Sequence, residues 1–216
     1  MQISGGGGGG YFGPKEIKYL FIDGGCISPV LDRISATFAG GAVLDLNYET
    51  LTRDYSKVFY YDALPERKLD EDETTYRARS APQRRLFDRL GSLDRFHVYE
   101  GDVRRSSSRR GPEQKKIDVM IAVDMLTHSF RRNMHEATLL TGDLDFKPLI
   151  DALVQQGMFV TLWYPPGTTS QELIAAADRS QRLSVVSIYD ALAAPRPFVI
   201  PKAYPGQKGC LDHVAG

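Results

Sequence analysis

The sequence predicts an α/β fold, a three-layer α/β/α sandwich with a mainly parallel central sheet. Short apolar runs that end at turns alternate along the chain with longer segments whose apolar residues recur at helical spacing. Strands that alternate with helices form a largely parallel sheet, because each connection crosses a face of the sheet and leaves a helix there. The length of 216 residues suits one such domain.

Each predicted strand is a short apolar run that is bounded by polar or turn-forming residues. These runs lie at 17–22, 57–64, 96–103, 137–140, 158–164 and 183–188. The first predicted helix begins with Ser28 as its N-cap and Pro29 as its first residue, and it ends at Gly40 and Gly41. Further helices are predicted at 71–90, 117–130, 146–156 and 170–179, where the apolar residues follow helical spacing.

Two segments with little capacity to pack a core flank the predicted domain. Residues 1–14 contain the run from Gly5 to Gly10 and are expected to form a flexible leader. Residues 193–216 are rich in Pro and Gly and are expected to form a C-terminal tail. We therefore assign the folded domain to residues 15–192.

Composition argues against several classes of protein. The sequence has no apolar run of about 18 residues and no secretory signal pattern, which argues against a membrane or secreted protein. Its two cysteines, Cys26 and Cys210, are far apart and do not form a disulfide framework, so a cytoplasmic location is expected. Lys plus Arg number 27 and Asp plus Glu 27, so a nucleic acid would have to be bound by a local basic patch.

Three acidic segments lie where a predicted element meets a turn. Asp23 follows the first strand, and Asp143, with Asp145 beside it, follows the fourth. Ligands of such sheets bind outside the carboxyl ends of the strands, so these side chains are expected at one edge. Asp118 lies at the start of the third predicted helix, where the helix dipole favours an anion. Asp124, six residues later, points to a different face of that helix.

Carboxylates that converge in this way are candidate ligands for a hard divalent cation such as Mg²⁺, which prefers oxygen donors. Such an ion can generate a hydroxide nucleophile and offset the charge that develops on a phosphate. Without a cation the carboxylates would repel one another, and one of them would bind a proton. The alternative is that each aspartate only caps a helix or forms a turn.

Basic side chains near these segments are candidate ligands for a nucleic-acid backbone. They are Lys115, Lys116 and Lys147 and, in the segment RRSSSRR at 104–110, Arg109 and Arg110. A solvated surface role is the alternative for each of them. The charged helix at 71–90 likewise is either a homodimer interface or a solvated surface.

The acidic segments resemble those of the NYN domain family, which belongs to the PIN-like nucleases and includes LabA-type bacterial proteins. The resemblance covers about residues 19–188, through the Asp-Gly turn at Asp23 and the segments KKIDVMIAVDML, TGDLDFKPLI and GMFVTLWYPPGTTSQELIAAADR. It implies a PIN-like α/β/α sandwich, a Mg²⁺ or Mn²⁺ site and ribonuclease activity toward RNA. It also implies that Asp23, Asp118 and Asp143 hold the metal, with Asp145 beside them in the catalytic group.

One position departs from the family pattern. NYN domains usually carry Asn three residues after the first Asp, and this chain has Cys26, whose thiol is a weaker hydrogen-bonding group than an amide. Two functions therefore stay open: a metal-dependent ribonuclease, and an NYN-fold module that binds RNA or a protein partner with little or no cleavage. A phosphatase of the haloacid dehalogenase kind would need a second Asp at the position of Gly25.

Overall fold

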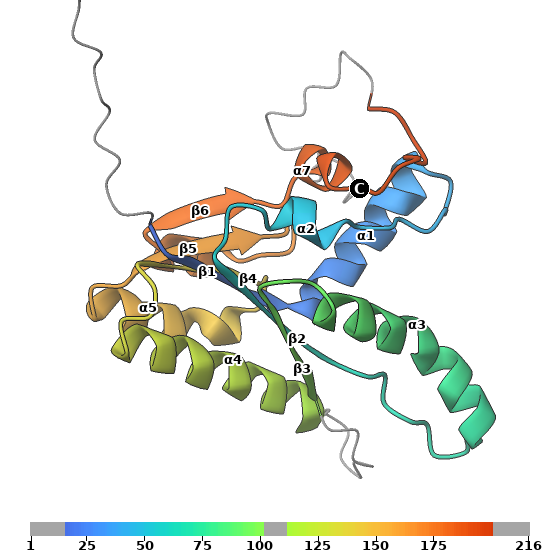
Figure 1. Ribbon diagram of the computed structural model, residues 1–216, viewed down its shortest axis with the longest axis horizontal. Helices are drawn as coiled ribbons and strands as arrows, with labels where there is room; N and C mark the ends of the chain where they lie inside the picture. The colour runs from blue at the N-terminus through green and yellow to red at the C-terminus, as the bar shows by residue number, and fades with distance from the viewer. Residues whose placement is uncertain (1–15, 102–111, 201–216) are drawn as a thin grey trace, which may run out of the picture.

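Within the described residues, six strands form one sheet in which all neighbours run parallel (Figure 1). The computed structural model describes residues 16–101 and 112–200. The strands are β1 (Lys18–Asp23), β2 (Lys57–Ala63), β3 (Phe96–Gly101), β4 (Glu136–Leu140), β5 (Phe159–Tyr164) and β6 (Arg179–Arg182). Their order across the sheet is β3-β2-β1-β4-β5-β6, which confirms the predicted fold class.

Helices cover both faces of this sheet (Figure 1). One face carries α1 (Gly24–Phe38), α2 (Tyr48–Leu51), α3 (Glu73–Gly91) and α7 (Val185–Asp190). The other carries α4 (Pro112–Phe130), the short 3₁₀ helix η1 (Leu144–Phe146), α5 (Lys147–Gln155) and α6 (Gln171–Ala176). In the part of the chain that the structure describes, no helix is long and apolar enough to cross a membrane.

β1 is fixed at the centre of the sheet by burial on both faces. Successive side chains of a strand point to opposite faces, so Leu20 and Ile22 pack beneath α1 while Phe21 packs beneath α4. All three side chains are fully buried, and burying a side chain of this size contributes roughly 1.5–3 kcal/mol. This double burial determines where Asp23, the last residue of β1, leaves the sheet.

The direction in which the chain builds the sheet reverses between β1 and β4. The chain proceeds outward from β1 through β2 to β3, then returns to the other side of β1 with β4 and proceeds outward again. The helices that follow the two central strands lie on opposite faces, α1 after β1 and α5 after β4. In open α/β sheets such a reversal leaves a crevice outside the carboxyl ends of the strands, where ligands bind.

The first helix begins earlier than the sequence predicts. α1 starts at Gly24, directly after β1, and not at Ser28. Pro29 therefore lies inside the helix, where its missing N–H removes one backbone hydrogen bond. Gly24 permits the early start because a Cβ at this position would lie 2.6 Å from both the Asp62 Oδ2 atom and the Tyr60 hydroxyl oxygen.

The predicted last strand is wrong, because a helix occupies most of that segment. The sixth strand, β6, comes earlier in the chain, and all four of its residues are exposed. It joins the sheet through backbone pairing with β5, which leaves no apolar pattern in the sequence. Val185 and Ile188 are buried on α7, and Ser184 caps that helix through its side chain.

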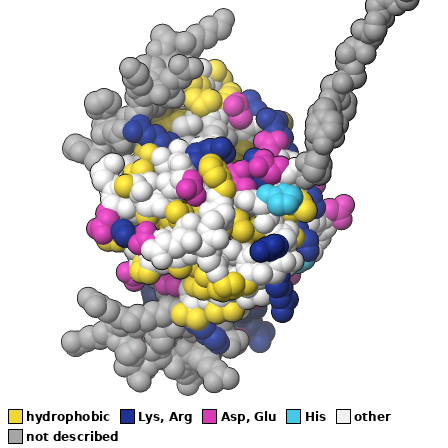
Figure 2. All heavy atoms as spheres, turned by 90° about the vertical axis from the view of Figure 1, so that its left-hand side faces the viewer, with side chains coloured by type: hydrophobic (Ala, Val, Ile, Leu, Met, Phe, Trp, Pro, Cys, Tyr) yellow, Lys and Arg dark blue, Asp and Glu magenta, His cyan; other side chains and the backbone are white. Residues whose placement is uncertain are grey.

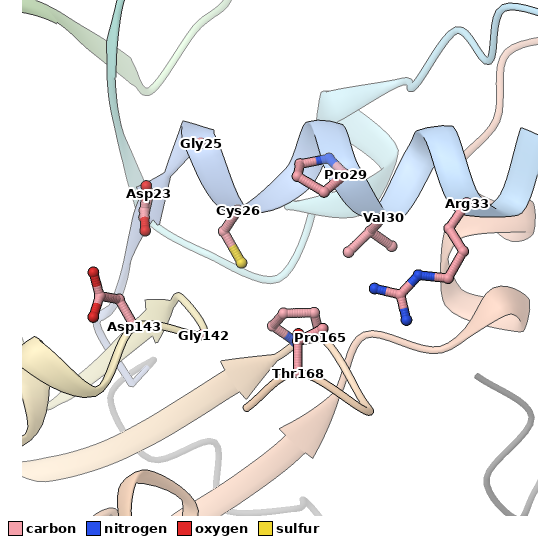
Figure 3. A pocket seen from close by; sticks show the side chains of 10 residues that line it. All are labelled: Asp23, Gly25, Cys26, Pro29, Val30, Arg33, Gly142, Asp143, Pro165 and Thr168. Carbon is pink, nitrogen blue, oxygen red and sulfur yellow. The ribbon is translucent and has the colours of Figure 1, made fainter. Parts of the chain in front are cut away.

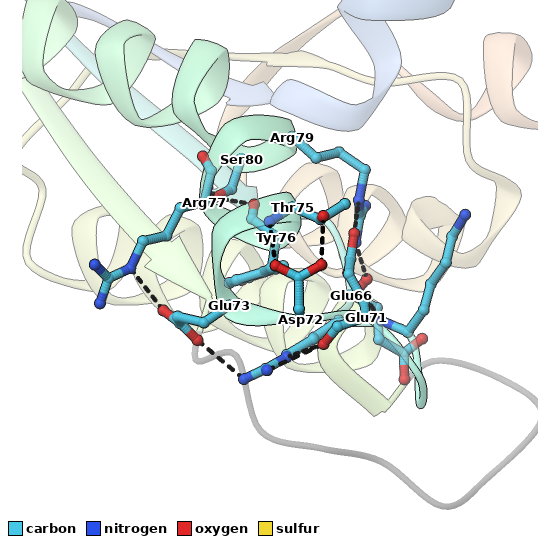
Figure 4. A network of polar contacts seen from close by, with 11 residues as sticks. Glu66, Glu71, Asp72, Glu73, Thr75, Tyr76, Arg77, Arg79 and Ser80 are labelled. Carbon is cyan, nitrogen blue, oxygen red and sulfur yellow. Dashed lines mark hydrogen bonds and ion pairs between the residues drawn. The ribbon is translucent and has the colours of Figure 1, made fainter.

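Charged side chains around the first turn of α3 form ion pairs (Figure 4). Asp72 caps the helix by accepting hydrogen bonds from the Thr75 N–H at 3.0 Å and the Thr75 hydroxyl at 2.6 Å. Glu71 pairs with Arg79 at 2.7 Å, and the Arg79 guanidinium lies over the ring of Tyr76. These contacts fasten the segment before α3 to the helix, while a homodimer interface on α3 stays one of two alternatives, beside a solvated surface.

The chain packs on the domain beyond Leu192, where the tail was expected to begin. Leu192 pairs with Leu46 in an isolated antiparallel bridge. Phe198 is buried, and its ring stacks on Phe38 with 5.6 Å between the ring centroids. The expected leader and the residues after 200 lie outside the described residues.

Candidate active site

Asp23 and Asp143 stand at the carboxyl ends of two neighbouring parallel strands. Asp23 ends β1, and Asp143 follows β4, with which β1 pairs. Thr141 connects them, because its hydroxyl donates to Asp23 Oδ2 at 2.9 Å and accepts from the Asp143 N–H at 3.2 Å. Asp143 Oδ1 in turn accepts from the Asp145 N–H at 2.9 Å, which caps η1. The reversal point of the sheet therefore carries adjacent carboxylates.

α4 brings Asp118 to the same place. Burial, together with the charges of Asp23, Asp143 and Asp145, raises the pKa of Asp118 to about 6. Burial also raises the pKa of Asp23, a rise that the hydrogen bond from Thr141 opposes and the charge of Asp143 reinforces. Carboxylates that influence one another in this way lie close together, since such repulsion weakens with distance. We call Asp23, Asp118, Asp143 and Asp145 the acidic cluster.

The predicted effect of the helix dipole on Asp118 is wrong, whereas the predicted separation of Asp118 from Asp124 is correct. α4 begins at Pro112, so Asp118 lies beyond its first turn, where the field of the helix N-terminus has faded. The expected separation of the two side chains is confirmed. Asp124 Oδ2 accepts a hydrogen bond from the Tyr61 hydroxyl at 2.7 Å and does not act on the pKa of Asp118.

A further carboxylate, Asp62, lies at the carboxyl end of β2, on the face that carries α1. Its Oδ1 accepts from the Ala63 N–H at 2.8 Å and its Oδ2 from the Tyr60 hydroxyl at 3.2 Å. Burial raises the pKa of Asp62 to about 6, and the charge of Asp23 contributes to the rise. Asp62 does not stand out in the sequence, because KVFYYDAL has no turn residue to mark the end of the strand. The pairing of β2 with β1 would have indicated it.

A groove of about 340 Å³ leads away from Asp23 and Asp143 along α1 (Figure 3). Residues of α1 form one wall, and Gly142 and the segment after β5 form the other. Arg33, on the third turn of α1, lines the groove with its guanidinium extended into it. Arg33 carries no signal in the sequence, because nothing in its neighbourhood along the chain relates it to the acidic cluster.

Cys26 also lines this groove, close to its acidic end. Burial raises the pKa of the Cys26 thiol to about 12, and the charge of Asp23 adds to the rise. The thiol therefore stays protonated at neutral pH, and the thiolate is the nucleophilic form of cysteine. Cys26 is thus a neutral group in the wall of the groove, not a nucleophile.

The structure describes only part of the predicted basic group. Lys116 is exposed on α4, and Lys147 forms an ion pair with Asp151 at 2.7 Å. The remaining predicted ligands lie outside the described residues or side chains: Lys115, Arg109 and Arg110. Figure 2 shows the opposite end of the molecule, around the amino ends of the strands, where Lys and Arg side chains are scattered among acidic and apolar ones.

The acidic cluster has the donor atoms of a divalent-cation site, but no three of its side chains are arranged to coordinate an ion directly. Its donors are carboxylate oxygens, which Mg²⁺ and Mn²⁺ prefer. Among the described residues, however, no group of three or more His, Cys, Asp or Glu side chains is arranged to hold an ion directly. Mg²⁺ usually keeps several waters and bonds to only one or two carboxylates. The cluster therefore fits an ion that is held partly through water.

Comparisons with known proteins identify the family and the fold of the chain. The NYN domain matches residues 42–184, about two thirds of the chain, which include Asp118 and Asp143. The fold is similar to the crystal structure of a protein of unknown function from Vibrio parahaemolyticus RIMD 2210633. The TM-score is 0.59 at 20% identity, over 83% of this chain and 97% of that one, a likeness that concerns the fold alone. No curated protein matches the sequence. The chain belongs to the NYN domain family, whose members are generally PIN-like nucleases.

Proposed function

We propose that this protein is a metal-dependent ribonuclease that hydrolyses phosphodiester bonds of RNA with the help of Mg²⁺ or Mn²⁺. The observation that carries the proposal is the acidic cluster, in which carboxylates from β1, α4 and the turn after β4 meet at the reversal point of the sheet. Membership of the NYN family supports nuclease chemistry. The choice of RNA rests on the family resemblance.

Asp23, Asp118 and Asp143 would hold the ion, which when bound would offset negative charge on the phosphate and activate a water molecule. The Thr141 hydroxyl fixes the orientation of the Asp23 carboxylate through its bond to Oδ2. Asp145 is exposed beside Asp143, so its carboxylate is free to accept a proton from the attacking water. Three members of the acidic cluster would thus hold the ion, and the fourth would act as the base.

The RNA backbone would be met by the basic residues around the cluster. Lys116 lies two residues before Asp118 on α4, so it shares the end of the helix that faces the cluster. Lys147 would have to leave Asp151 before it could bind a phosphate. We propose the same role for Lys115, Arg109 and Arg110.

A nuclease assay tests this proposal. The purified protein is incubated with single-stranded RNA, hairpin RNA and single-stranded DNA, in Mg²⁺, in Mn²⁺ and in EDTA. We expect RNA cleavage that EDTA abolishes, and a loss of at least about a hundredfold in Asp143→Asn, as is typical when a charged catalytic group is removed. Asp88→Asn, which changes an exposed carboxylate on α3, is the matched control. Absence of cleavage by the wild type, or equal cleavage by both variants, would contradict the proposal.

A second function is an NYN module that binds RNA or a protein partner without cutting. Two observations favour it: the neutral thiol of Cys26 at the family's Asn position, and the lack of a direct three-ligand group among the described residues. Under this hypothesis RNA binding would be the same in EDTA and in Mg²⁺ and would persist in Asp23→Asn. Cleavage of RNA that requires the ion would exclude it in favour of the nuclease.

A further inference from the structure

The groove along α1 has opposite charges at its two ends. Asp23 and Asp143 form one end, and Arg33 reaches into the groove at the other (Figure 3). Thr168, on the segment after β5, stands across the groove from Arg33 and is exposed. A ligand that lies along the groove would thus meet carboxylates at one end and a guanidinium at the other.

Arg33 is a half-buried cation without a partner among the described residues. Its guanidinium takes part in no hydrogen bond or ion pair with any of them. Thr37 donates its hydroxyl to the Arg33 backbone carbonyl, which leaves the side chain unengaged. Other arginines of the chain do pair with carboxylates: Arg67, Arg77, Arg79, Arg89 and Arg179. A cation that loses part of its hydration without gaining a partner is costly, and a planar guanidinium matches the oxygens of a phosphate.

The distance along α1 between Asp23 and Arg33 is long enough for two successive phosphates of a nucleic-acid strand. Asp23 immediately precedes the helix and Arg33 lies ten residues later, which corresponds to about 15 Å along the helix axis. Helical side chains tilt toward the N-terminus, so the guanidinium lies closer to the carboxylates than its Cα does. One phosphate cannot reach both ends of such a span, whereas two phosphates with a nucleoside between them can.

The middle of the groove suits a nucleoside. Pro29 of α1 and Pro165 line it, and neither side chain carries a polar group. The volume of about 340 Å³ is near the lower end of the roughly 300–1,000 Å³ that is typical of small-molecule sites. A groove of this size accepts one base or ribose of a single strand, and a duplex is too wide to enter it.

We propose that this groove binds single-stranded RNA, with one nucleotide between the acidic cluster and Arg33, and that Arg33 binds the phosphate beyond that nucleotide. The identity of the ligand rests on the proposed nuclease function. The groove, its charges and the unpaired guanidinium do not depend on whether the bond is cut.

Binding measured in EDTA tests the proposal without cleavage. The affinity of a short fluorescent single-stranded RNA is determined by anisotropy for the wild type, Arg33→Gln and Arg84→Gln, the last removing an exposed arginine of α3. We expect Arg33→Gln to weaken binding about tenfold, as the loss of a charged hydrogen bond does, and the control to bind like the wild type. Hairpin RNA should bind equally to all three. Equal affinities of wild type and Arg33→Gln for the single strand would overturn the proposal.

The phosphate that Arg33 contacts is located with RNAs that carry one neutral methylphosphonate at successive positions. We expect the wild type to lose affinity at one particular position, and Arg33→Gln to be insensitive to the substitution at that position. A position effect of the same size in both proteins would overturn the assignment. Thr168→Trp provides a second variant, because a large side chain at this exposed rim should obstruct the groove and weaken single-strand binding while α1 stays unchanged.

The outcomes separate this inference from the proposed function. If the protein does not cut RNA but Arg33→Gln weakens single-strand binding, the groove stands and the nuclease proposal fails. If the protein cuts RNA with the same KM and kcat in the wild type and Arg33→Gln, the nuclease proposal stands and the groove assignment fails.

Discussion

Asp62 is a buried carboxyl group whose titration should be visible in the stability of the protein. Burial raises its pKa from 3.8 to about 6. A carboxyl whose pKa is higher in the folded state contributes stability that is fully present below about pH 4 and is lost as the pH rises through about 6. At neutral pH the folded protein therefore bears the cost of holding Asp62 charged.

Asp62→Asn should remove this cost. A shift of about two units sets an upper limit of roughly 3 kcal/mol, and partial solvent exposure reduces the expected gain to about 1–2 kcal/mol near pH 7. Below about pH 4 the gain should vanish, because Asp62 is then neutral in both states. Urea unfolding at both pH values measures it, with Asp88→Asn as the exposed control. A gain of equal size at both pH values would show that the charge is not its origin.

Cys26 stands where the resemblance to NYN domains leads us to expect Asn, and introducing that amide should raise activity. The groove beside Cys26 has room for an amide, and an amide can donate to a phosphate oxygen where a neutral thiol hardly can. We expect Cys26→Asn to increase kcat/KM for RNA about tenfold, the effect of roughly one added hydrogen bond to a charged group. Cys26→Ala is the control for space alone. Equal rates for Asn and Ala at this position would exclude a role for the amide.

At the scale of the element, the start of α1 depends on the absence of a side chain at Gly24. A Cβ there would meet Asp62 Oδ2, Asp62 Cβ and the Tyr60 hydroxyl at 2.6–2.7 Å, so β2 or α1 would have to shift. We expect Gly24→Ala to lower the free energy of unfolding by about 2–3 kcal/mol, a typical cost of overpacking. Gly91→Ala, at the exposed end of α3 with nothing within 4 Å of its Cβ, should be neutral or slightly stabilising. Equal effects of the two changes in denaturant unfolding would contradict this account.

The sequence was sufficient for elements whose burial leaves a pattern in it. β1, β2, β4 and β5 are apolar because parallel strands are covered on both faces, and each was found within one or two residues of its bounds. β6 was missed because its four residues are exposed and pair with β5 through the backbone, which leaves no apolar pattern in the sequence. The predicted start of α1 is wrong because Ser28 and Pro29 are residues typical of a helix start. The close approach of Gly24 to Asp62 comes from the tertiary structure and leaves no pattern in the sequence.

The same division holds for the candidate site. Asp23 and Asp143 were identifiable because each follows an apolar strand at a turn, and the edge of a parallel sheet brings such residues together. Asp118 was predicted because a helix N-terminus favours an anion, but α4 begins at Pro112, so Asp118 is not in its first turn. Asp62 and Arg33 were not identified, since the former lies inside a strand-like segment and the latter is related to the cluster only by the packing of α1. Local patterns thus indicated the carboxylates, and tertiary structure was needed for the groove.

At the scale of the whole molecule, a protein of zero net charge concentrates negative charge at one end of its sheet. Positive and negative residues are equal in number along the chain. The strand order nevertheless brings the ends of β1 and β4 side by side, and α4 adds Asp118 to them. Repulsion within the acidic cluster opposes folding when no cation is present. A divalent ion and the folded state should therefore stabilise each other.

This coupling gives opposite expectations for Asp118→Asn with and without the ion. Without metal, removing one of the repelling charges should raise the stability by about 1 kcal/mol, or a Tm increase of roughly 2–4 °C for a chain of this size. With Mn²⁺ at about a hundred times its Kd, the wild type should gain about 2.7 kcal/mol, whereas the variant, which lacks a ligand, should gain much less. Thermal unfolding with and without Mn²⁺ measures both, with Asp88→Asn following the wild type. An equal Mn²⁺-induced shift in Asp118→Asn and the wild type would mean that the ion binds elsewhere than in the acidic cluster, and the nuclease proposal would lose its foundation.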